Sequence, residues 1–144
     1  MVVGFKFAGT CARHPNEIPD ENLQMFYHSL HQALQSKDVR DGEWNLCERD
    51  RLAGQSELHL NVVARFWQQE ADHHLIVVNL SGTYSKTQIR LPWDDLADRP
   101  RRLSDQLQKT VYDRAGDGLQ TSGLYVDLGS WVTTFFTANA VDRA

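Results

Sequence analysis

The sequence predicts a mainly β protein, an antiparallel β-sandwich preceded by one amphipathic α-helix. Apolar residues recur at helical spacing only between residues 20 and 37, and after Asp41-Gly42 the pattern changes to period two. The later segments are short and are separated by turn residues, which favours a sandwich or a barrel. The 144 residues fit one domain and are too few for a complete (β/α)8 barrel, which needs roughly 200 or more.

The helix is expected between residues 20 and 37. Asp20 follows Pro19 and can cap the free backbone N–H groups of the first turn, while Lys37 complements the negative end of the helix dipole. Five apolar residues at helical spacing form one face, the apolar stripe: Leu23, Phe26, Tyr27, Leu30 and Leu34. This stripe needs a partner surface.

Seven strands are expected after the helix: 43–48, 58–68, 74–81, 84–91, 107–113, 123–128 and 131–137. Thr87, Ile89 and Leu91 alternate with polar residues, so their strand has one buried face and one solvent-facing side. The continuous apolar run 75–78 is typical of a central strand that is covered on both faces, here partly by the helix. Residues 114–118 are expected to form a hairpin loop, because their glycines allow positive φ angles.

Composition excludes several classes of function. The net charge of -4 gives no surface for nucleic acid or an anionic membrane, and the one basic cluster is expected in a solvated loop: Arg99, Arg101 and Arg102. No segment approaches the ~20 apolar residues of a membrane span. Cys11 and Cys47 match no disulfide framework or metal motif, so two reduced thiols in a cytoplasmic protein are expected.

No catalytic, metal or cofactor site is expected, and the chain by itself is predicted not to be an enzyme. The histidine pairs lack further ligands at metal-binding spacing: His28 with His31, and His73 with His74. Glycoside hydrolysis needs two carboxylates across a sugar. The closest acidic pairs lie in predicted turns, where a carboxylate usually bonds its own backbone: Asp94 with Asp95, and Asp113 with Asp117.

Four aromatic residues fall into two groups, one expected in the core and one at strand ends. Trp44 is in phase with Leu46, and Trp131 with Phe135, so both tryptophans are predicted in the core. Trp93 and Tyr84 lie at strand ends instead. These two are candidates for contact with a sugar, since sugar-binding modules stack pyranose rings on exposed aromatic side chains. The alternative for both is partial burial, under a loop or against the missing domain, and that alternative is favoured.

Four collinear segments resemble the end of many α-amylase-family glycoside hydrolases. They are His74–Ser81, similar to "LLVAVNLS"; Ile89–Trp93, similar to "VRLPW"; Leu103–Leu107, similar to "L-x-D-L-L"; and Gly123–Leu128 continuing through Trp131 to Phe136, similar to "GLYVDLPPWGFHLF". Upstream, Phe26 to Leu34 and then Arg40–Trp44, with its "DGEW" string, look like the link from the family's barrel into that domain. Order, spacing and content agree together.

The resemblance implies a Greek-key sandwich packed beside a (β/α)8 barrel. The family's catalytic acids lie in barrel motifs such as "GFRxD" and "NHD", and neither string occurs in this sequence. It also implies three parts: a barrel-exit segment with the helix (1–41), the sandwich (42–137) and a tail (138–144).

The expected function is that of a non-catalytic accessory domain that stabilises the barrel of an enzyme of carbohydrate metabolism, with that barrel as its partner. One alternative is a starch- or glycogen-binding module that uses Trp93 and Tyr84, with α-glucan as a partner. Another is a free-standing interaction protein. The isolated chain is expected to form a homodimer through the apolar stripe, because uncovered apolar patches drive association and twofold pairs are the commonest outcome.

Overall fold

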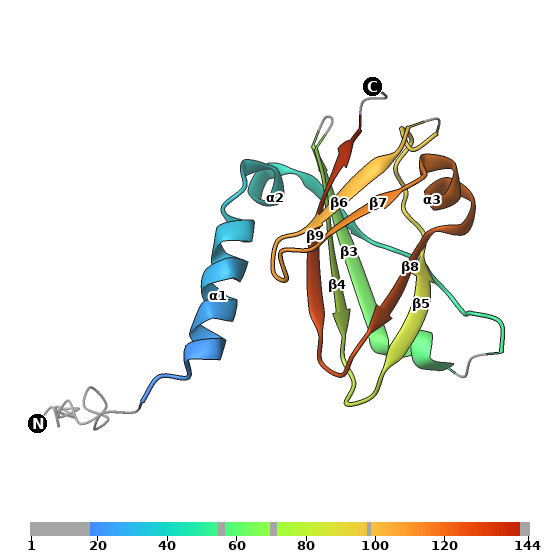
Figure 1. Cartoon of the computed structure of the whole chain (residues 1–144). Coiled ribbons are helices and arrows are strands. Elements are labelled where there is room, and N and C mark those ends of the chain that lie inside the picture. Colours follow the sequence, from blue (N-terminus) through green and yellow to red (C-terminus); the bar gives the residue numbers. More distant parts are fainter. Residues whose placement is uncertain (1–17, 55–56, 70–71, 98, 142–144) are drawn as a thin grey trace, which may run out of the picture.

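Figure 1 shows the computed structural model of the chain, in which residues 18–54, 57–69, 72–97 and 99–141 are described. These residues form two antiparallel sheets, which confirms the predicted sandwich. The larger sheet has the strand order β1 (Glu43–Leu46), β3 (Val62–Gln69), β4 (Asp72–Asn79), β9 (Thr133–Ala140), β6 (Arg101–Asp105) and β7 (Val111–Arg114). The smaller sheet has the order β2 (Arg49–Asp50), β5 (Ser85–Ile89) and β8 (Leu124–Leu128).

The predicted helix is present as α1 (Glu21–Leu34). The Oδ1 of Asp20 accepts hydrogen bonds from the N–H groups of Asn22 at 3.0 Å and Leu23 at 3.1 Å, so the expected cap is present. The helix ends earlier than expected, because the chain turns at Gln35 and a short helix α2 (Lys37–Asp41) follows. No residue of α1 is buried, and Figure 1 shows α1 apart from the sandwich, with the larger sheet between it and the smaller one.

The core lies between the two sheets. In β5 the predicted alternation is confirmed, since Thr87 and Ile89 are fully buried and Lys86 and Gln88 are not. The apolar run 75–78 lies in β4, a central strand as expected, with its odd-numbered residues in the core. Its even-numbered residues are only partly buried. The expectation that α1 covers them is wrong, because α1 buries none of its own residues.

Residues 101–105 form β6, although 99–102 were expected to be a solvated loop. Arg101 is only 2% exposed, because its guanidinium donates to the carbonyl oxygen of Asp95 and lies 2.7 Å from Oδ2 of the same residue. Because the buried Arg101 is a charged residue at an inward position, the alternation of apolar and polar residues that marks a strand is not visible in the sequence of β6. The next strand, β7, begins at Val111 rather than at 107. A turn precedes it, in which Oδ1 of Asp105 accepts N–H bonds from Leu107 at 2.9 Å and Gln108 at 3.2 Å.

Two further segments differ from expectation. The expected loop 114–118 runs into a helix, α3 (Gly116–Ser122), whose only buried side chain is Leu119, too little to give an apolar periodicity. The expected strand 58–68 starts with a 3-10 helix, η2 (Glu57–Asn61), before β3. In addition β9 continues to Ala140, so the first three residues of the predicted tail belong to the sheet. Cys11, most of the segment 1–41 ahead of the helix, and the last residues of the tail lie outside the described residues.

The prediction that Trp44 and Trp131 lie in the core is wrong. Trp44 is 53% exposed, because its strand is an edge strand and its pairing with Trp67 places it on the outer face of the larger sheet. Trp131 is 67% exposed and lies in the β8–β9 connection with a φ of 59°, so the period of β9 does not extend to it. Phe135, by contrast, is fully buried.

A buried asparagine joins the two sheets at one end of the sandwich. Asn79, at the end of β4, is 0% exposed. Its amide nitrogen lies within hydrogen-bonding distance of three carbonyl oxygens: Thr83 at 2.8 Å, Leu128 at 3.2 Å and Gly129 at 2.8 Å. One side chain therefore holds the β4–β5 turn against the end of β8.

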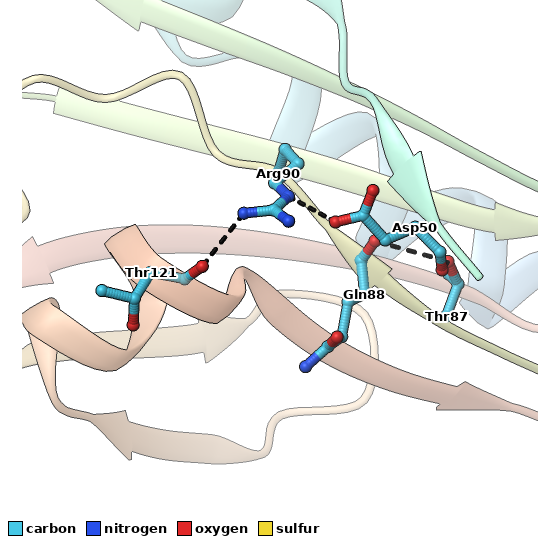
Figure 2. A network of polar contacts seen from close by, with 5 residues as sticks. All are labelled: Asp50, Thr87, Gln88, Arg90 and Thr121. Carbon is cyan, nitrogen blue, oxygen red and sulfur yellow. Dashed lines mark hydrogen bonds and ion pairs between the residues drawn. The ribbon is translucent and has the colours of Figure 1, made fainter. Parts of the chain in front are cut away.

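A second polar network closes the edge of the smaller sheet (Figure 2). Arg90 donates through Nε to a carboxylate oxygen of Asp50 and through Nη1 to the carbonyl oxygen of Thr121 at 3.0 Å. The hydroxyl of Thr87 donates to the backbone carbonyl of Asp50 at 2.8 Å. These bonds hold the two-residue strand β2 and the end of α3 against β5.

Candidate functional site

The sandwich is open along one side, between the last strand of each sheet. β7 ends the larger sheet and β8 ends the smaller one, and neither pairs on its outer edge with another described strand. A groove of about 400 Å³ lies between them. Its apolar lining comes from the core: Leu103, Leu124, Val126, Leu128, Val132 and Phe136. The volume is within the range of about 300–1,000 Å³ that is usual for small-molecule sites.

Three tyrosines line this groove. Tyr84 is 65% exposed, Tyr125 is 49% exposed and Tyr112 is 39% exposed. Tyr112 is in contact on two sides. Its ring centre lies 6.1 Å from that of Phe136 in an edge-to-face arrangement and 5.5 Å from the guanidinium carbon of Arg114. Aromatic rings in such positions offer flat apolar faces beside a polar hydroxyl.

The lining of the groove contains one residue of each charge. Arg114 of β7 and Asp127 of β8 are its only lining residues with a formal charge. Asp127 is also oriented by Lys86, whose Nζ lies 3.3 Å from Oδ2. This contact raises the pKa of the Lys86 ammonium, since the hydrogen bond to Asp127 favours its protonated form. Lys86 is not part of the lining, but with Arg114 it places two positive charges beside the single negative charge of Asp127.

One polar atom in the groove lining has no partner. Thr134 of β9 lines the groove and is 6% exposed, and its Oγ1 has no hydrogen-bond partner among the described parts of the chain. A buried hydroxyl without a partner is unfavourable by about 1–3 kcal/mol. Such groups are uncommon in folded proteins. The accessible surface of Oγ1 is below 1 Å², so the atom lies beneath the surface of the groove.

The structure separates the two candidates for sugar contact: Tyr84 is exposed, whereas Trp93 is buried, as the favoured alternative had it. Tyr84 lines the groove. Trp93 does not line it and is only 3% exposed, and its ring packs 4.7 Å from the ring of the buried His73. Neither face of Trp93 is open to a ligand. The sequence analysis did not name Tyr125, although the alternation of 123–128 already placed it on the outward side of its strand. It also did not name Tyr112, because the start of that strand was predicted four residues too early.

Two of the four carboxylates named from the sequence, Asp95 and Asp113, are held in ion pairs. Asp95 lies 2.7 Å from Arg101 and 3.5 Å from Nε2 of His73, and Asp113 lies 2.8 Å from Arg102. Partial burial acts to raise the pKa of Asp95, but the Arg101 hydrogen bond and the His73 charge outweigh it and the pKa is lowered. The Arg102 hydrogen bond likewise lowers the pKa of Asp113. Both groups are therefore ionised at neutral pH and unsuited to general acid catalysis.

Other reactive groups form no centre in the described residues. No three groups of the kind that bind metal come together there. Burial raises the pKa of the Cys47 thiol to about 12, so this cysteine is protonated at neutral pH and a poor nucleophile.

A second surface lies on the side of the larger sheet that faces away from the smaller sheet. On this outer face Arg65 lies between two rings, 3.7 Å from the centre of Trp44 and 4.5 Å from that of Trp67. Leu46 beside them is 66% exposed. Figure 1 shows α1 on this same side of the sandwich. The exposed apolar residues of α1 and of β1 are here called the outer apolar surface: Leu23, Phe26, Tyr27, Leu34, Trp44 and Leu46.

Neither the scan against protein-family models nor the search of curated proteins gave a match. Within the described ranges, no helix is long and apolar enough to cross a membrane.

Proposed function

We propose that this chain is a non-catalytic accessory domain of an α-amylase-type glycoside hydrolase, and that it covers and stabilises the enzyme's catalytic (β/α)8 barrel. The parent enzyme acts in cytoplasmic carbohydrate metabolism. The observation that carries the proposal is the outer apolar surface. A helix of 14 residues with no buried side chain is marginally stable in water by itself, so α1 requires a partner that covers its stripe.

The position of α1 supports a large partner. The helix and the outer face of the larger sheet lie on one side of the molecule, with apolar side chains on both. A barrel surrounded by helices presents a convex surface of sufficient size to contact both at once. Large exposed apolar patches are rare on monomeric proteins and usually mark an interaction surface.

The segments that carry the resemblance are those on which this fold depends. The "LLVAVNLS"-like segment lies in β4 and contains the buried Asn79. The "L-x-D-L-L"-like segment contains Asp105, which holds the turn before β7. The "GLYVDL"-like segment begins at Gly123, where φ is 79° and a side chain would meet the carbonyl oxygen of Ile89 at 2.5 Å. Residues that hold turns and join sheets in this way are expected to recur in proteins of the same fold.

The chemistry of the described residues supports a non-catalytic role. Asp95 and Asp113 are ion-paired and stay ionised. We therefore expect no hydrolysis of starch, glycogen, trehalose or maltooligosaccharides by the purified chain. Turnover that a single Asp or Glu substitution abolishes would overturn this part of the proposal.

The accessory role is tested by the reading frame that precedes the Met1 codon. We expect it to continue upstream into a sequence with α-amylase barrel motifs. An in-frame stop codon directly upstream would contradict the accessory role and favour a free-standing interaction protein.

A further inference from the structure

We propose that the open edge of β8 binds an extended peptide as an added strand, with one apolar side chain of the peptide in the groove and one acidic side chain beside Arg114. The inference goes beyond the proposed function and does not depend on it. It rests on the direction of the backbone groups of β8, on the apolar lining of the groove and on the charges around it.

The hydrogen bonds of the smaller sheet show which way the backbone of β5 points. The N–H of Arg90, directly after β5, donates to the carbonyl oxygen of Glu48 at 2.9 Å, on the side of β2. Backbone groups alternate in direction along a strand, so those of Ile89 point the other way, toward β8. Ile89 lies opposite Leu124, and this pair therefore exchanges hydrogen bonds between the two strands.

The same alternation leaves four backbone groups on the open edge of β8. Since Leu124 and Val126 point toward β5, the N–H and C=O groups of Tyr125 and Asp127 point away from it. No other described strand pairs with β8, and within the described ranges none of these four groups has a hydrogen-bond partner. Proteins usually cover, shorten or charge such an edge. Its row of donors and acceptors is complementary to the backbone of an extended peptide, which is the basis of strand addition.

The groove gives the added strand a place for an apolar side chain. Residues that lie opposite each other on paired strands have their side chains on the same face of the sheet. The peptide residue opposite Val126 therefore points to the inner face, as the buried Val126 does. There it meets the apolar lining that the larger sheet contributes, Leu103 and Phe136, in a groove of about 400 Å³.

The charges around the groove favour a peptide with an acidic residue. Arg114 in the lining and Lys86 beside it outnumber the single carboxylate of Asp127. Asp127 is paired with Lys86 at 3.3 Å, whereas Arg114 has no carboxylate partner among the described residues and donates through Nη1 to the carbonyl oxygen of Asp113 at 3.0 Å. Arginine forms strong hydrogen bonds with carboxylates. An acidic residue two positions from the apolar one lies on the same inner face, and we expect it to pair with Arg114.

The test is a calorimetric titration of the whole chain with a heptapeptide that is blocked at both ends. The peptide has threonine at alternate positions and valine, phenylalanine and glutamate, in that order, between them. We expect saturable binding, and NMR should show that the amide protons of Tyr125 and Asp127 become protected from hydrogen exchange. Replacement of the peptide's glutamate by lysine should weaken the affinity by about tenfold, the loss of one charge-assisted hydrogen bond.

Two N-methylated versions of the peptide are a matched pair. In the proposed pairing the threonines on either side of phenylalanine point their N–H groups toward β8, while the N–H of phenylalanine points away. Methylation of the two threonine nitrogens should therefore abolish binding. Methylation of the phenylalanine nitrogen should leave the affinity nearly unchanged.

On the protein, Asp127→Pro removes an N–H that the sheet does not use, so the domain should keep its fold while the affinity for the peptide falls by about tenfold or more. The control is Asp127→Ala, which also loses the contact with Lys86 but keeps the N–H. It should bind the peptide at least as tightly as the natural chain. If Asp127→Pro does not fold, the two methylated peptides decide the question.

Four outcomes would overturn the proposal. The first is absence of saturable binding, and the second is equal binding of the two methylated peptides. The third is a folded Asp127→Pro variant that binds as tightly as Asp127→Ala. The fourth is a dimer of the chain that Asp127→Pro dissociates, which would assign the edge of β8 to pairing with a second copy.

Discussion

Replacement of the buried Asn79 is expected to bring the domain close to unfolding. Its amide nitrogen is shared among three carbonyl oxygens, and its Oδ1 accepts from the N–H of Ser81 at 3.1 Å, the hydroxyl of Ser81 at 2.9 Å and the hydroxyl of Ser85 at 3.0 Å. Asn79→Ala removes all of these bonds. Each net hydrogen bond is worth about 1 kcal/mol, and each buried group left without a partner adds about 1–3 kcal/mol of destabilisation.

Some of the freed groups will reach water, because Ser81 and Thr83 lie near the surface. We therefore expect a loss of about 3–5 kcal/mol in the free energy of unfolding, out of the roughly 5–15 kcal/mol that a domain of this size possesses. Asn79→Asp keeps the volume and the acceptor atom but turns a carboxylate oxygen toward three carbonyls. It should be destabilised at least as much as Asn79→Ala.

The assay is equilibrium unfolding in urea, followed by tryptophan fluorescence and circular dichroism. Asn139→Ala, an exposed position of β9, is the control and should change the free energy by no more than about 0.5 kcal/mol. If Asn79→Ala lost less than about 1 kcal/mol, the asparagine would not join the two sheets as described.

Three further predictions test other parts of the structure. Gly123→Ala should destabilise by several kcal/mol, roughly 2–4, because φ is 79° and the new Cβ would lie 2.5 Å from the carbonyl oxygen of Ile89; Gly118→Ala in α3, with nothing within 4 Å, should be neutral or stabilising in the same urea assay. Folding lowers the pKa of Asp95, so the ion pair stabilises the fold above the unfolded pKa of about 3.9 and this stabilisation is lost as the pH falls through the folded pKa. Asp95→Asn should therefore lose less stability than the natural chain on acidification from about pH 5 to pH 2. An equal loss would refute the lowered pKa of Asp95. The isolated chain should self-associate in sedimentation through the apolar stripe, and Phe26→Glu should shift it to monomer; a dimer that this variant leaves intact would place the contact elsewhere.

Part of the candidate site was accessible from the sequence. Tyr84 was named because it lies at a strand end, and it does line the groove. Trp93 was named on the same ground, with partial burial as the favoured alternative, and its ring is buried against His73. A position at a strand end predicts that a residue lies outside the regular pairing of the sheet. It does not predict whether the following loop covers its side chain. The sequence does not distinguish Thr134 from other threonines, because the lack of a hydrogen-bond partner depends on the residues packed around it.

The sequence by itself determined the elements whose information is local. The spacing of the apolar stripe and the cap at Asp20 predicted α1, and the alternation around Ile89 predicted which side of β5 is buried, since both depend only on neighbours along the chain. Tertiary structure decided what depends on partners. Trp44 keeps its predicted phase with Leu46, yet both lie on the outer face, because alternation defines two faces without saying which of them meets the other sheet. Arg101 lies inside because Asp95, six residues earlier, satisfies its charge. The groove likewise exists because β7 and β8, which belong to different sheets, end those sheets on the same side of the sandwich.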